Sequence, residues 1–324
     1  MKAVLVKSLT GPQDLVYADH ELEKPGKGRV LIEVKYAGVN YPDLLMTKGM
    51  YQFQPDLPFS PGGEVAGVIK EVGEGVSNYQ AGDRVVAGTT WGGFAEVALG
   101  FAQNTFLLPD DILLKDAASI LMTHGTVIHA LKDRAQIKEG ETLVVLGASG
   151  GVGTATIQIG KILGAKVIAM TSNEEKANYC ISAGADEAYT YDLGNLKEKL
   201  KTITNGKGAD VIFDPIGGDY SEQAFRGIAT MGRHLVIGFA AGKVPGIPWN
   251  LPLLKSASIV GVFWGSFFRN YPTENQKNIE ELMNWVREGQ LVPIVDEIFP
   301  LHETASAIKK LQERNVKGKV LVEV

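Results

Sequence analysis

The sequence of 324 residues has very little cysteine: Cys180 is the only one. A single cysteine can neither form a disulfide within the chain nor supply a four-cysteine structural zinc site. The five histidines show neither the His-x-x-x-His nor the His-Glu-x-x-His spacing that places two ligands on one helix face. We therefore expect no metal site.

The sequence also lacks long hydrophobic runs and concentrated positive charge. No stretch approaches the apolar length of a membrane span, and the apolar run between Lys2 and Lys7 is too short for the core of a signal peptide. The net charge is −5 without a basic cluster, which argues against a nucleic-acid partner. We expect a protein of the reducing cytoplasm that binds neither membranes nor nucleic acids.

Glycine, in contrast, is abundant at 38 residues, which predicts many tight turns. The chain is long enough for two domains. Residues 1–115 contain short runs rich in β-forming residues, separated by glycine, proline and aspartate. This pattern predicts a compact, mostly β unit with little helix. Residues 116–135 then have a helical period, which we expect to break at Gly125.

From residue 141 on, strands and helices alternate with short connections, as in ETLVVLGASGGVG, TATIQIGKILG, AKVIAMT and ADVIFDPIGG. That pattern predicts an α/β domain with a doubly wound parallel sheet of the Rossmann type. The last segment, GKVLVEV, is an alternating apolar strand that needs a sheet partner in the N-terminal unit. We therefore predict a first domain of residues 1–118 and 268–324, with a second domain, 119–267, inserted into it.

The strongest motif is LVVLGASGGVG, in which Ala148, Gly150 and Gly153 form a variant of the Gly-x-Gly-x-x-Gly dinucleotide fingerprint. It follows an apolar strand and opens an amphipathic helix, which is the required context. Gly150 lets the backbone approach a pyrophosphate, and Gly153 lets the helix pack close to the strand. The helix N-terminus offers N–H groups to the phosphates. The predicted cofactor residues of this motif are Ala148, Gly150, Gly151, Val152 and Gly153.

The end of the second strand of this domain, in AKVIAMTSNEEK, decides between NAD and NADP. An NAD site has a carboxylate there to bind the ribose diol. This chain instead has a neutral Thr-Ser-Asn run centred on Ser172, followed by Lys176. Hydroxyls and a cation suit a 2′-phosphate, which favours NADPH. Glu174 and Glu175 would repel a phosphate, and we expect them in the first turn of the next helix, pointing away.

A set of ordered motifs runs through nearly the whole chain: VKYAGVNYPDLL (34–45), LPFSPGGEVAGVI (57–69), VGEGVSNYQAGDRV (72–85), WGGFAEVA (91–98), GASGGVGTATIQIGK (147–161), FDPIGG (213–218) and PLHETASAIKKL (300–311). These motifs resemble the medium-chain dehydrogenase/reductase superfamily, and within it the zinc-independent NADPH:quinone oxidoreductases. The resemblance implies that the mostly β unit is a GroES-like catalytic domain and that the cofactor is NADPH.

The resemblance also bears on the metal. Zinc-dependent relatives have a cysteine ligand at the position of Asn40 and a Gly-His-Glu at the position of Gly62-Gly63-Glu64. The residues that match the two zinc ligands here are asparagine and glycine, so the resemblance implies chemistry without zinc. Glu64 is then expected to be a structural hydrogen-bonding residue.

Further site residues follow only from the resemblance. Asn40 and Thr126 match residues beside the nicotinamide, and Tyr51 matches a tyrosine of the active cleft. Leu45 departs from the pattern, since related enzymes have a second cleft tyrosine there. The residues that match the 2′-phosphate site of bacterial members are Lys176, Tyr191 and Arg314. The cofactor-lining set is completed by Phe239 and by Phe263 of the segment VFWGSFF.

A site without a Lewis acid cannot activate an alcohol in the manner of zinc. We expect hydride transfer from NADPH to an acceptor that is already electrophilic, a quinone or an α,β-unsaturated carbonyl compound. Candidate donors to the developing negative charge are Asn40, Tyr41, Tyr51 and a hydroxyl group of the cofactor. We assign Asn40 and Tyr51 as catalytic residues. No His/Asp/Ser constellation is visible, so we assign no general acid and expect solvent to supply the proton.

Alternatives remain open at this point. The chain could be a one- or two-electron quinone reductase, an enone or enoyl-thioester reductase, or a non-catalytic NADPH- or RNA-binding protein. Asn40 could be a turn residue, and Tyr51 and Trp264 could be core or interface aromatics. The apolar stretch ASIVGVFWG could form a sheet edge that pairs with its own copy, from which we expect a homodimer.

Overall fold

The computed structural model describes all 324 residues, and the chain divides into two compact units. Unit 1 comprises Met1–Met122 and Phe267–Val324, and unit 2 comprises Thr123–Ser266. The sequence placed the first boundary at 118/119 and the second at 267/268. The first boundary lies inside a continuous helix, α2 (Leu114–Ile128), where no turn residue marks it.

Unit 1 is built around a seven-stranded sheet with the order β14-β15-β3-β4-β5-β7, and β6 pairs with β3 off this path. A separate two-stranded sheet joins β1 and β2. Most of these strands pair antiparallel, which suits short strands with one buried and one wet face. The strands are β1 (Lys2–Leu5), β2 (Val16–Asp19), β3 (Arg29–Val39), β4 (Glu64–Val72), β5 (Arg84–Gly88), β6 (Val97–Phe101), β7 (Thr105–Leu107), β14 (Val295–Pro300) and β15 (Lys319–Glu323).

Unit 1 also contains a helix that the sequence pattern did not predict, α1 (Tyr41–Thr47). Asn40 caps this helix, Asp43 completes a capping box, and Pro42 lies in the first turn. These local signals outweigh the surrounding β-rich composition. The other helices of the unit are α9 (Pro272–Arg287) and α10 (Thr304–Gln312), with 3-10 turns at Pro12–Asp14, Ala102–Asn104 and Leu301–Glu303.

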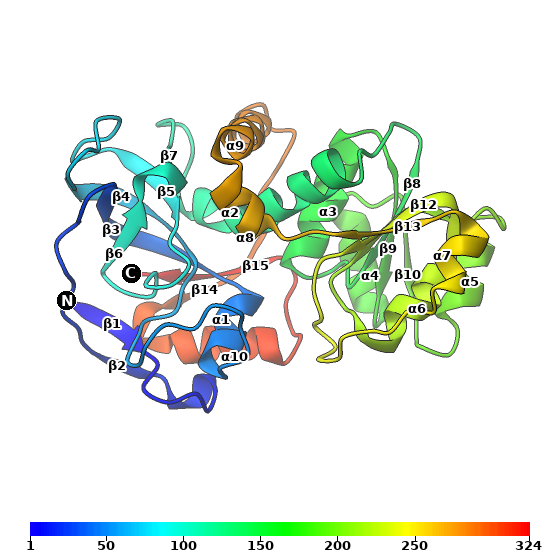
Figure 1. Ribbon diagram of the computed structural model, residues 1–324, viewed down its shortest axis with the longest axis horizontal. Helices are drawn as coiled ribbons and strands as arrows, with labels where there is room; N and C mark the ends of the chain where they lie inside the picture. The colour runs from blue at the N-terminus through cyan, green and yellow to red at the C-terminus, as the bar shows by residue number, and fades with distance from the viewer. The chain divides into compact units, whose positions relative to one another are not determined.

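The closing strand pairs as predicted. β15 lies antiparallel to β3, with Val322 opposite Ala37, and parallel to β14 on its other side. In Figure 1 the red end of the chain accordingly lies among the blue strands of its beginning. The core of unit 1 mixes residues from both segments, including Ile32, Phe94 and Val320.

Unit 2 is a parallel sheet with the order β10-β9-β8-β11-β12-β13. The order reverses at the first strand, β8, which confirms the predicted doubly wound Rossmann fold. Its strands are β8 (Thr142–Leu146), β9 (Lys166–Thr171), β10 (Glu187–Thr190), β11 (Ala209–Asp214), β12 (Ile228–Val236) and β13 (Ser258–Gly261). Its helices are α3 (Gly151–Ile162), α4 (Glu174–Ser182), α5 (Leu196–Ile203), α6 (Gly218–Arg226) and α7 (Asn250–Lys255).

Two segments differ from the predicted elements. α2 does not break at Gly125 but continues to Ile128 and into a π-helical stretch, His129–Arg134. Gly125 is needed for close packing instead, because an added Cβ would lie 2.8 Å from the Trp264 ring. The expected strand in ASIVGVFWG ends at Gly261, and Trp264 begins α8 (Trp264–Asn270). No helix of the structure has the length and apolar character needed to cross a membrane.

Candidate functional site

The dinucleotide motif forms the turn between β8 and α3. Gly150 caps the helix and leaves the space before it open: an added Cβ would meet only the Gly147 carbonyl oxygen, at 3.7 Å. Gly153 is enclosed, since an added Cβ would lie 2.6 Å from backbone atoms of Ala148. The two glycines therefore have different surroundings, one suited to a ligand and one to close helix–strand packing.

This turn has the chemistry to hold a pyrophosphate. The first N–H groups of a helix have no carbonyl partner within it, and they carry a positive partial charge. The first turn of α3 contains no acidic residue. The turn follows β8, which has β9 and β11 as neighbours, at the point where the strand order reverses. Ligands of doubly wound sheets bind at that point, so the residues present fit a dinucleotide.

The predicted 2′-phosphate residues of unit 2 lie at the carboxyl ends of two neighbouring strands. Ser172 directly follows β9 and is exposed. Asn173 caps α4 by accepting a hydrogen bond from the Lys176 backbone N–H at 2.9 Å. Tyr191 follows β10, and its N–H donates to the Thr171 carbonyl at 3.0 Å. The fold thus brings Ser172, Lys176 and Tyr191 to one edge of the sheet.

Glu174 and Glu175, the acidic residues beside this site, were expected to point away from it, and Glu174 does not. Glu174 and Glu175 do lie in the first turn of α4. The side chain of Glu174, however, turns toward the neighbouring strand, where its Oε1 accepts a hydrogen bond from the Thr190 hydroxyl at 3.3 Å. The cause is the short connection: only Ser172 and Asn173 separate β9 from α4. Glu174 is therefore a negative charge close to the strand ends.

The other predicted cofactor residues lie at scattered positions. Thr126 is in α2, and Arg314 follows α10 in unit 1. Phe239 follows β12 and packs against Gly217, where an added Cβ would lie 2.8 Å from the ring. Phe263 precedes α8 and is 46% exposed. The assignment of these residues to the cofactor site rests on the resemblance.

In unit 1, Asn40 is first of all a structural residue. It is the N-cap of α1, and its backbone N–H donates to Asp43 Oδ2 at 2.8 Å. Asp43 Oδ1 in turn accepts a hydrogen bond from the Gly62 N–H at 3.1 Å. Asp43 therefore joins the start of α1 to the turn that precedes β4.

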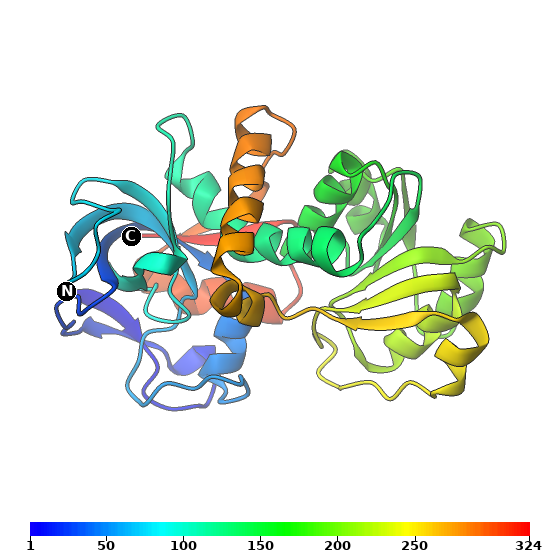
Figure 2. The same cartoon turned by 45° about the horizontal axis from the view of Figure 1, so that its top comes forward.

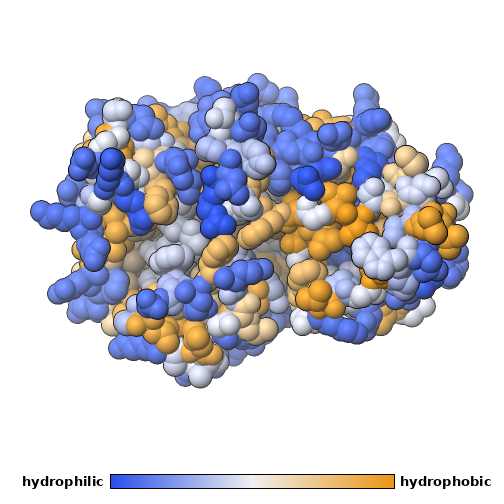
Figure 3. Space-filling model, viewed as in Figure 1, coloured by the Kyte–Doolittle hydropathy of each residue, from blue (hydrophilic) through white to orange (hydrophobic).

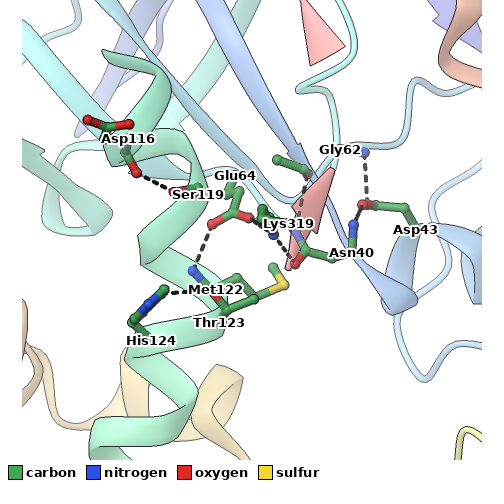
Figure 4. A network of polar contacts seen from close by, with 11 residues as sticks. Asn40, Asp43, Gly62, Glu64, Asp116, Ser119, Met122, Thr123, His124 and Lys319 are labelled. Atoms are coloured by element: carbon green, nitrogen blue, oxygen red, sulfur yellow. Dashed lines mark hydrogen bonds and ion pairs between the residues drawn. The ribbon is translucent and has the colours of Figure 1, made fainter. Parts of the chain in front are cut away.

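The side-chain amide of Asn40 lies in a buried polar network (Figure 4). Its Nδ2 donates to the Gly38 carbonyl at 3.1 Å and to Glu64 Oε1 at 2.9 Å, while its Oδ1 accepts from Lys319 Nζ at 2.5 Å. Lys319 also donates to Glu64 Oε1, and Glu64 Oε2 accepts from the Met122 N–H at 2.7 Å. Glu64 is thus the structural hydrogen-bonding residue predicted. Both amide N–H groups of Asn40 are bound within the protein, which leaves none for the donor role expected of this residue.

Lys319 is the residue of this network that the sequence motifs did not predict. It opens the alternating apolar strand GKVLVEV. A charged residue at an inward-facing position of a strand is rarely buried unless it has a charged partner. That signal was present in the sequence, but the partner, Glu64, lies 255 positions earlier.

Burial alters the acid–base properties of Asp43 and Tyr51. Asp43 is fully buried, and desolvation raises its pKa to about 7, although its two backbone hydrogen bonds and Lys319 oppose the shift. Desolvation also raises the pKa of Tyr51, which keeps its hydroxyl a donor at neutral pH. The Tyr51 ring packs edge-on against Phe53, with ring centres 6.2 Å apart, and the Arg269 guanidinium lies 4.5 Å from the Phe53 ring centre.

The two positions that match zinc ligands in relatives are Asn40 and Gly63. A Cβ added at Gly63 would lie 2.8 Å from the terminal methyl group of Met122. No group of three or more His, Cys, Asp or Glu side chains lies together in a way that could hold a metal ion. His124 and His129 instead have a hydroxyl and a carboxylate as hydrogen-bond partners.

Comparisons with known proteins agree with the fold of the two units. Residues 26–114 match the model of the alcohol dehydrogenase GroES-like domain, and residues 151–287 match that of the zinc-binding dehydrogenases. Quinone oxidoreductase-like protein 2 of Bos taurus is 36% identical over 90% of this chain and 84% of its own length.

Two solved structures share the fold over the whole chain. The Escherichia coli quinone oxidoreductase complexed with NADPH has a TM-score of 0.93 and 28% identity, with all of both chains covered. A mycobacterial protein complexed with NADPH has a TM-score of 0.94 and 30% identity, again over all of both chains. The chain therefore belongs to the quinone oxidoreductase family of the medium-chain dehydrogenase/reductase superfamily and is an oxidoreductase of that family.

Proposed function

We propose that this protein is an NADPH-dependent reductase that delivers hydride to quinones without a metal ion. The observation that carries the proposal is the turn at Gly150, open at the N-terminus of α3 and placed where the strand order of the sheet reverses. The similar structures from Escherichia coli and the mycobacterium, both complexed with NADPH, support it.

The choice of NADPH over NADH rests on the strand ends of β9 and β10. Ser172, Lys176 and Tyr191 offer hydroxyl groups and a cation to a 2′-phosphate, and no carboxylate stands directly at the end of β9. Arg314 joins this set by the resemblance alone. Glu174 is the opposing charge, and its hydrogen bond with Thr190 engages one of its oxygens.

The metal-free part of the proposal rests on Lys319. Its ammonium group contacts both Asn40, at a position that matches a zinc ligand, and Glu64. Gly63, at the second such position, has no side chain to offer. A cation already bonded to these side chains would repel a divalent ion, which favours an acceptor that needs no Lewis acid.

When bound, the reduced nicotinamide supplies the hydride, and the protein holds and orients both partners. α3 binds the pyrophosphate through its N–H groups. Tyr51, with a protonated hydroxyl, is the candidate donor to the oxygen that becomes negative on the acceptor, and solvent supplies the final proton. Asn40 contributes as a fixed part of the site rather than as a free donor.

A cofactor and acceptor panel tests the proposal. Purified protein is mixed with NADPH or NADH, and cofactor oxidation is followed with quinones, with simple enones and with enoyl-CoA thioesters, each with and without a metal chelator. We expect turnover with NADPH and quinones that the chelator does not change. Turnover restricted to enones or enoyl thioesters would favour the alternative reductase, and tight NADPH binding without any turnover would favour a non-catalytic role.

We also propose that the chain forms a homodimer through unit 2. β13 is the last strand of its sheet and pairs only with β12, as Figure 2 shows. α7 buries none of its residues: Leu253 and Leu254 are 77% and 76% exposed, and the adjacent Trp249 is 83% exposed. Figure 3 shows the hydrophobic surface at the right edge, where α7 lies in Figure 1. An exposed apolar face beside an open sheet edge suits pairing with a second copy.

The mass in solution decides this second proposal. We expect light scattering to give about twice the chain mass of 34.9 kDa for the native protein. The double substitution Leu253→Glu/Leu254→Glu should give the single-chain mass. A native protein that is monomeric at micromolar concentration would contradict the dimer.

A further inference from the structure

Two charged neighbours of opposite kind hold the Asn40 amide in one orientation. An ammonium group has only donors, so Lys319 must face the amide oxygen, and a carboxylate has only acceptors, so Glu64 must face the amide nitrogen. The contacts follow this logic, at 2.5 Å for Lys319 and 2.9 Å for Glu64. A reversed amide would set N–H against ammonium and oxygen against carboxylate, and both contacts would be repulsive.

The sheet fixes both charged groups. Lys319 is 4% exposed and Glu64 is 0% exposed, so neither can exchange its partner for water. Lys319 opens β15, where its backbone N–H donates to the Ile294 carbonyl at 2.9 Å. Glu64 opens β4 and stands opposite Gly38 of β3 in the ladder. The orientation of the amide is therefore set by the register of β15, β3 and β4.

A third ionisable group holds the backbone of the same residue. Asp43 accepts the Asn40 backbone N–H and is close enough to Lys319 and Glu64 for their charges to act on it. Asn40 is thus fixed at its backbone by one carboxyl group and at its side chain by an ion pair. Such double fixing is more than a helix cap requires, because a cap needs only one side-chain hydrogen bond.

We propose that Lys319 is a positioning residue for the reduction: together with Glu64 it selects the orientation of the Asn40 amide and so fixes the part of the site that Asn40 forms. This inference rests on the proposed function, because it takes Asn40 to be part of the site where the acceptor receives the hydride. Small displacements of a group at a reacting centre slow hydride transfer strongly, by about 100-fold for about 1 Å.

The first variant is Lys319→Met, which keeps an unbranched side chain, one atom shorter, and removes its charge. We expect kcat with a quinone to fall about 10- to 100-fold, while NADPH affinity, set by α3 and the strand ends of unit 2, stays within about threefold. Because this variant leaves Glu64 buried without a counter-charge, its folding is also at risk.

The double variant Glu64→Gln/Lys319→Met removes both charges and keeps the shape of the pair. Replacing a whole buried ion pair by neutral groups costs little stability, so this protein should fold. In this variant the Met122 N–H needs the glutamine oxygen, so the glutamine NH2 faces Asn40 and no longer accepts from its amide nitrogen. We expect native-like thermal stability with kcat still about 10-fold or more below native. A double variant that is both stable and fully active would overturn the proposal.

A matched control tests whether loss of any lysine charge in unit 1 has the same effect. Lys310 is paired with Asp296 and Glu297, far along the sequence from Asn40. Lys310→Met should leave kcat unchanged. A fall in kcat equal to that of Lys319→Met would show a general effect of charge removal and would contradict the proposal.

A readout without turnover separates this proposal from the proposed function. With 15N-labelled asparagine, the side-chain amide signals of Asn40 are identified by their loss in Asn40→Ser. We expect slow hydrogen exchange in the native protein, and fast exchange or doubled signals in the double variant. Unchanged signals in that variant would overturn the positioning role. If the native protein reduces no acceptor, the proposed function fails, and these signals alone decide the role of Lys319.

Discussion

Two glycines of the dinucleotide turn give a prediction at the scale of single residues. Gly150 has free space where a Cβ would stand, whereas Gly153 has Ala148 backbone atoms at 2.6 Å. We expect Gly150→Ala to leave the free energy of unfolding nearly unchanged and to weaken NADPH binding at least 10-fold, because the methyl group occupies space that the pyrophosphate needs. We expect Gly153→Ala to lower the free energy of unfolding by about 1–3 kcal/mol.

Thermal unfolding and a fluorescence titration with NADPH measure the two effects in the same samples. Each glycine variant serves as the control for the other. Equal losses of stability in both variants would mean that Gly150 is a packing residue, and the turn would then no longer support a ligand site.

Asp43 gives a pH dependence. Its pKa is raised from an ordinary value of 3.8 to about 7 by burial, so the folded protein holds a proton that the unfolded chain releases. The proton stabilises the folded state at low pH, and this stabilisation is lost as the pH rises from about 4 to about 7. The native protein should therefore lose stability relative to Asp43→Asn across that range, by a few kcal/mol in order of magnitude.

Urea denaturation of both proteins at several pH values measures this difference, and the variant removes the contributions of all other titrating groups. The asparagine variant carries a constant cost, because it has one acceptor oxygen for two backbone N–H groups. A difference that is flat with pH, or one that grows in favour of the native protein, would contradict the raised pKa.

The geometry of the dinucleotide turn could be predicted from the sequence more fully than the contacts of Asn40 in unit 1. Gly150 and Gly153 form a contiguous motif whose geometry follows from one strand–turn–helix connection. The Asn40 network joins four chain segments. Only the folded structure shows which groups bind the donors and the acceptor of the Asn40 side chain. The sequence pointed to Asn40 but could not show that Lys319 and Glu64 occupy its amide.

At the scale of elements, the short connection between β9 and α4 brings two opposite charges, those of Lys176 and Glu174, to the predicted 2′-phosphate site. We expect Lys176→Ala to weaken NADPH binding about 10- to 100-fold, since a charge-assisted hydrogen bond is lost, and to leave NADH binding nearly unchanged. Glu174→Gln should act in the opposite direction and tighten NADPH binding about two- to fivefold.

Titrations with NADPH and NADH, repeated at high salt, measure both effects. Lys201→Ala on α5 of the same unit is a suitable control, because this half-buried lysine pairs with Glu198 within α5, away from the carboxyl ends of the strands. An equal loss of NADPH and NADH affinity in Lys176→Ala would assign that lysine a role other than reading the 2′-phosphate.

Element boundaries were less predictable than element types. The alternation in residues 142–236 correctly predicted the parallel sheet, because buried parallel strands and crossover helices have distinct periods. Gly125 was wrongly read as a helix break, since its reason is a tertiary contact with Trp264. α1 was missed because a seven-residue helix depends on capping rather than on hydrophobic period.

At the scale of the whole molecule, the two units differ in how the chain builds them. Unit 2 is one continuous segment with a complete sheet, and unit 1 is assembled from two segments. We expect a fragment of residues 123–266 to fold and unfold cooperatively by circular dichroism. A fragment of residues 1–122 should not, because it lacks β14, β15 and the core residues Leu301, Ile308 and Val320. Cooperative unfolding of that N-terminal fragment would contradict this expectation.

The place of β15 in the sheet has a consequence for the order of events on the ribosome. Residues 123–266 form a compact unit of their own and are translated before residues 319–323. Until β15 is present, Tyr36–Val39 of β3 lack their partner strand and Glu64 lacks its counter-charge. The strand that completes this sheet also delivers Lys319, so the same late step that closes the fold sets the Asn40 amide in place.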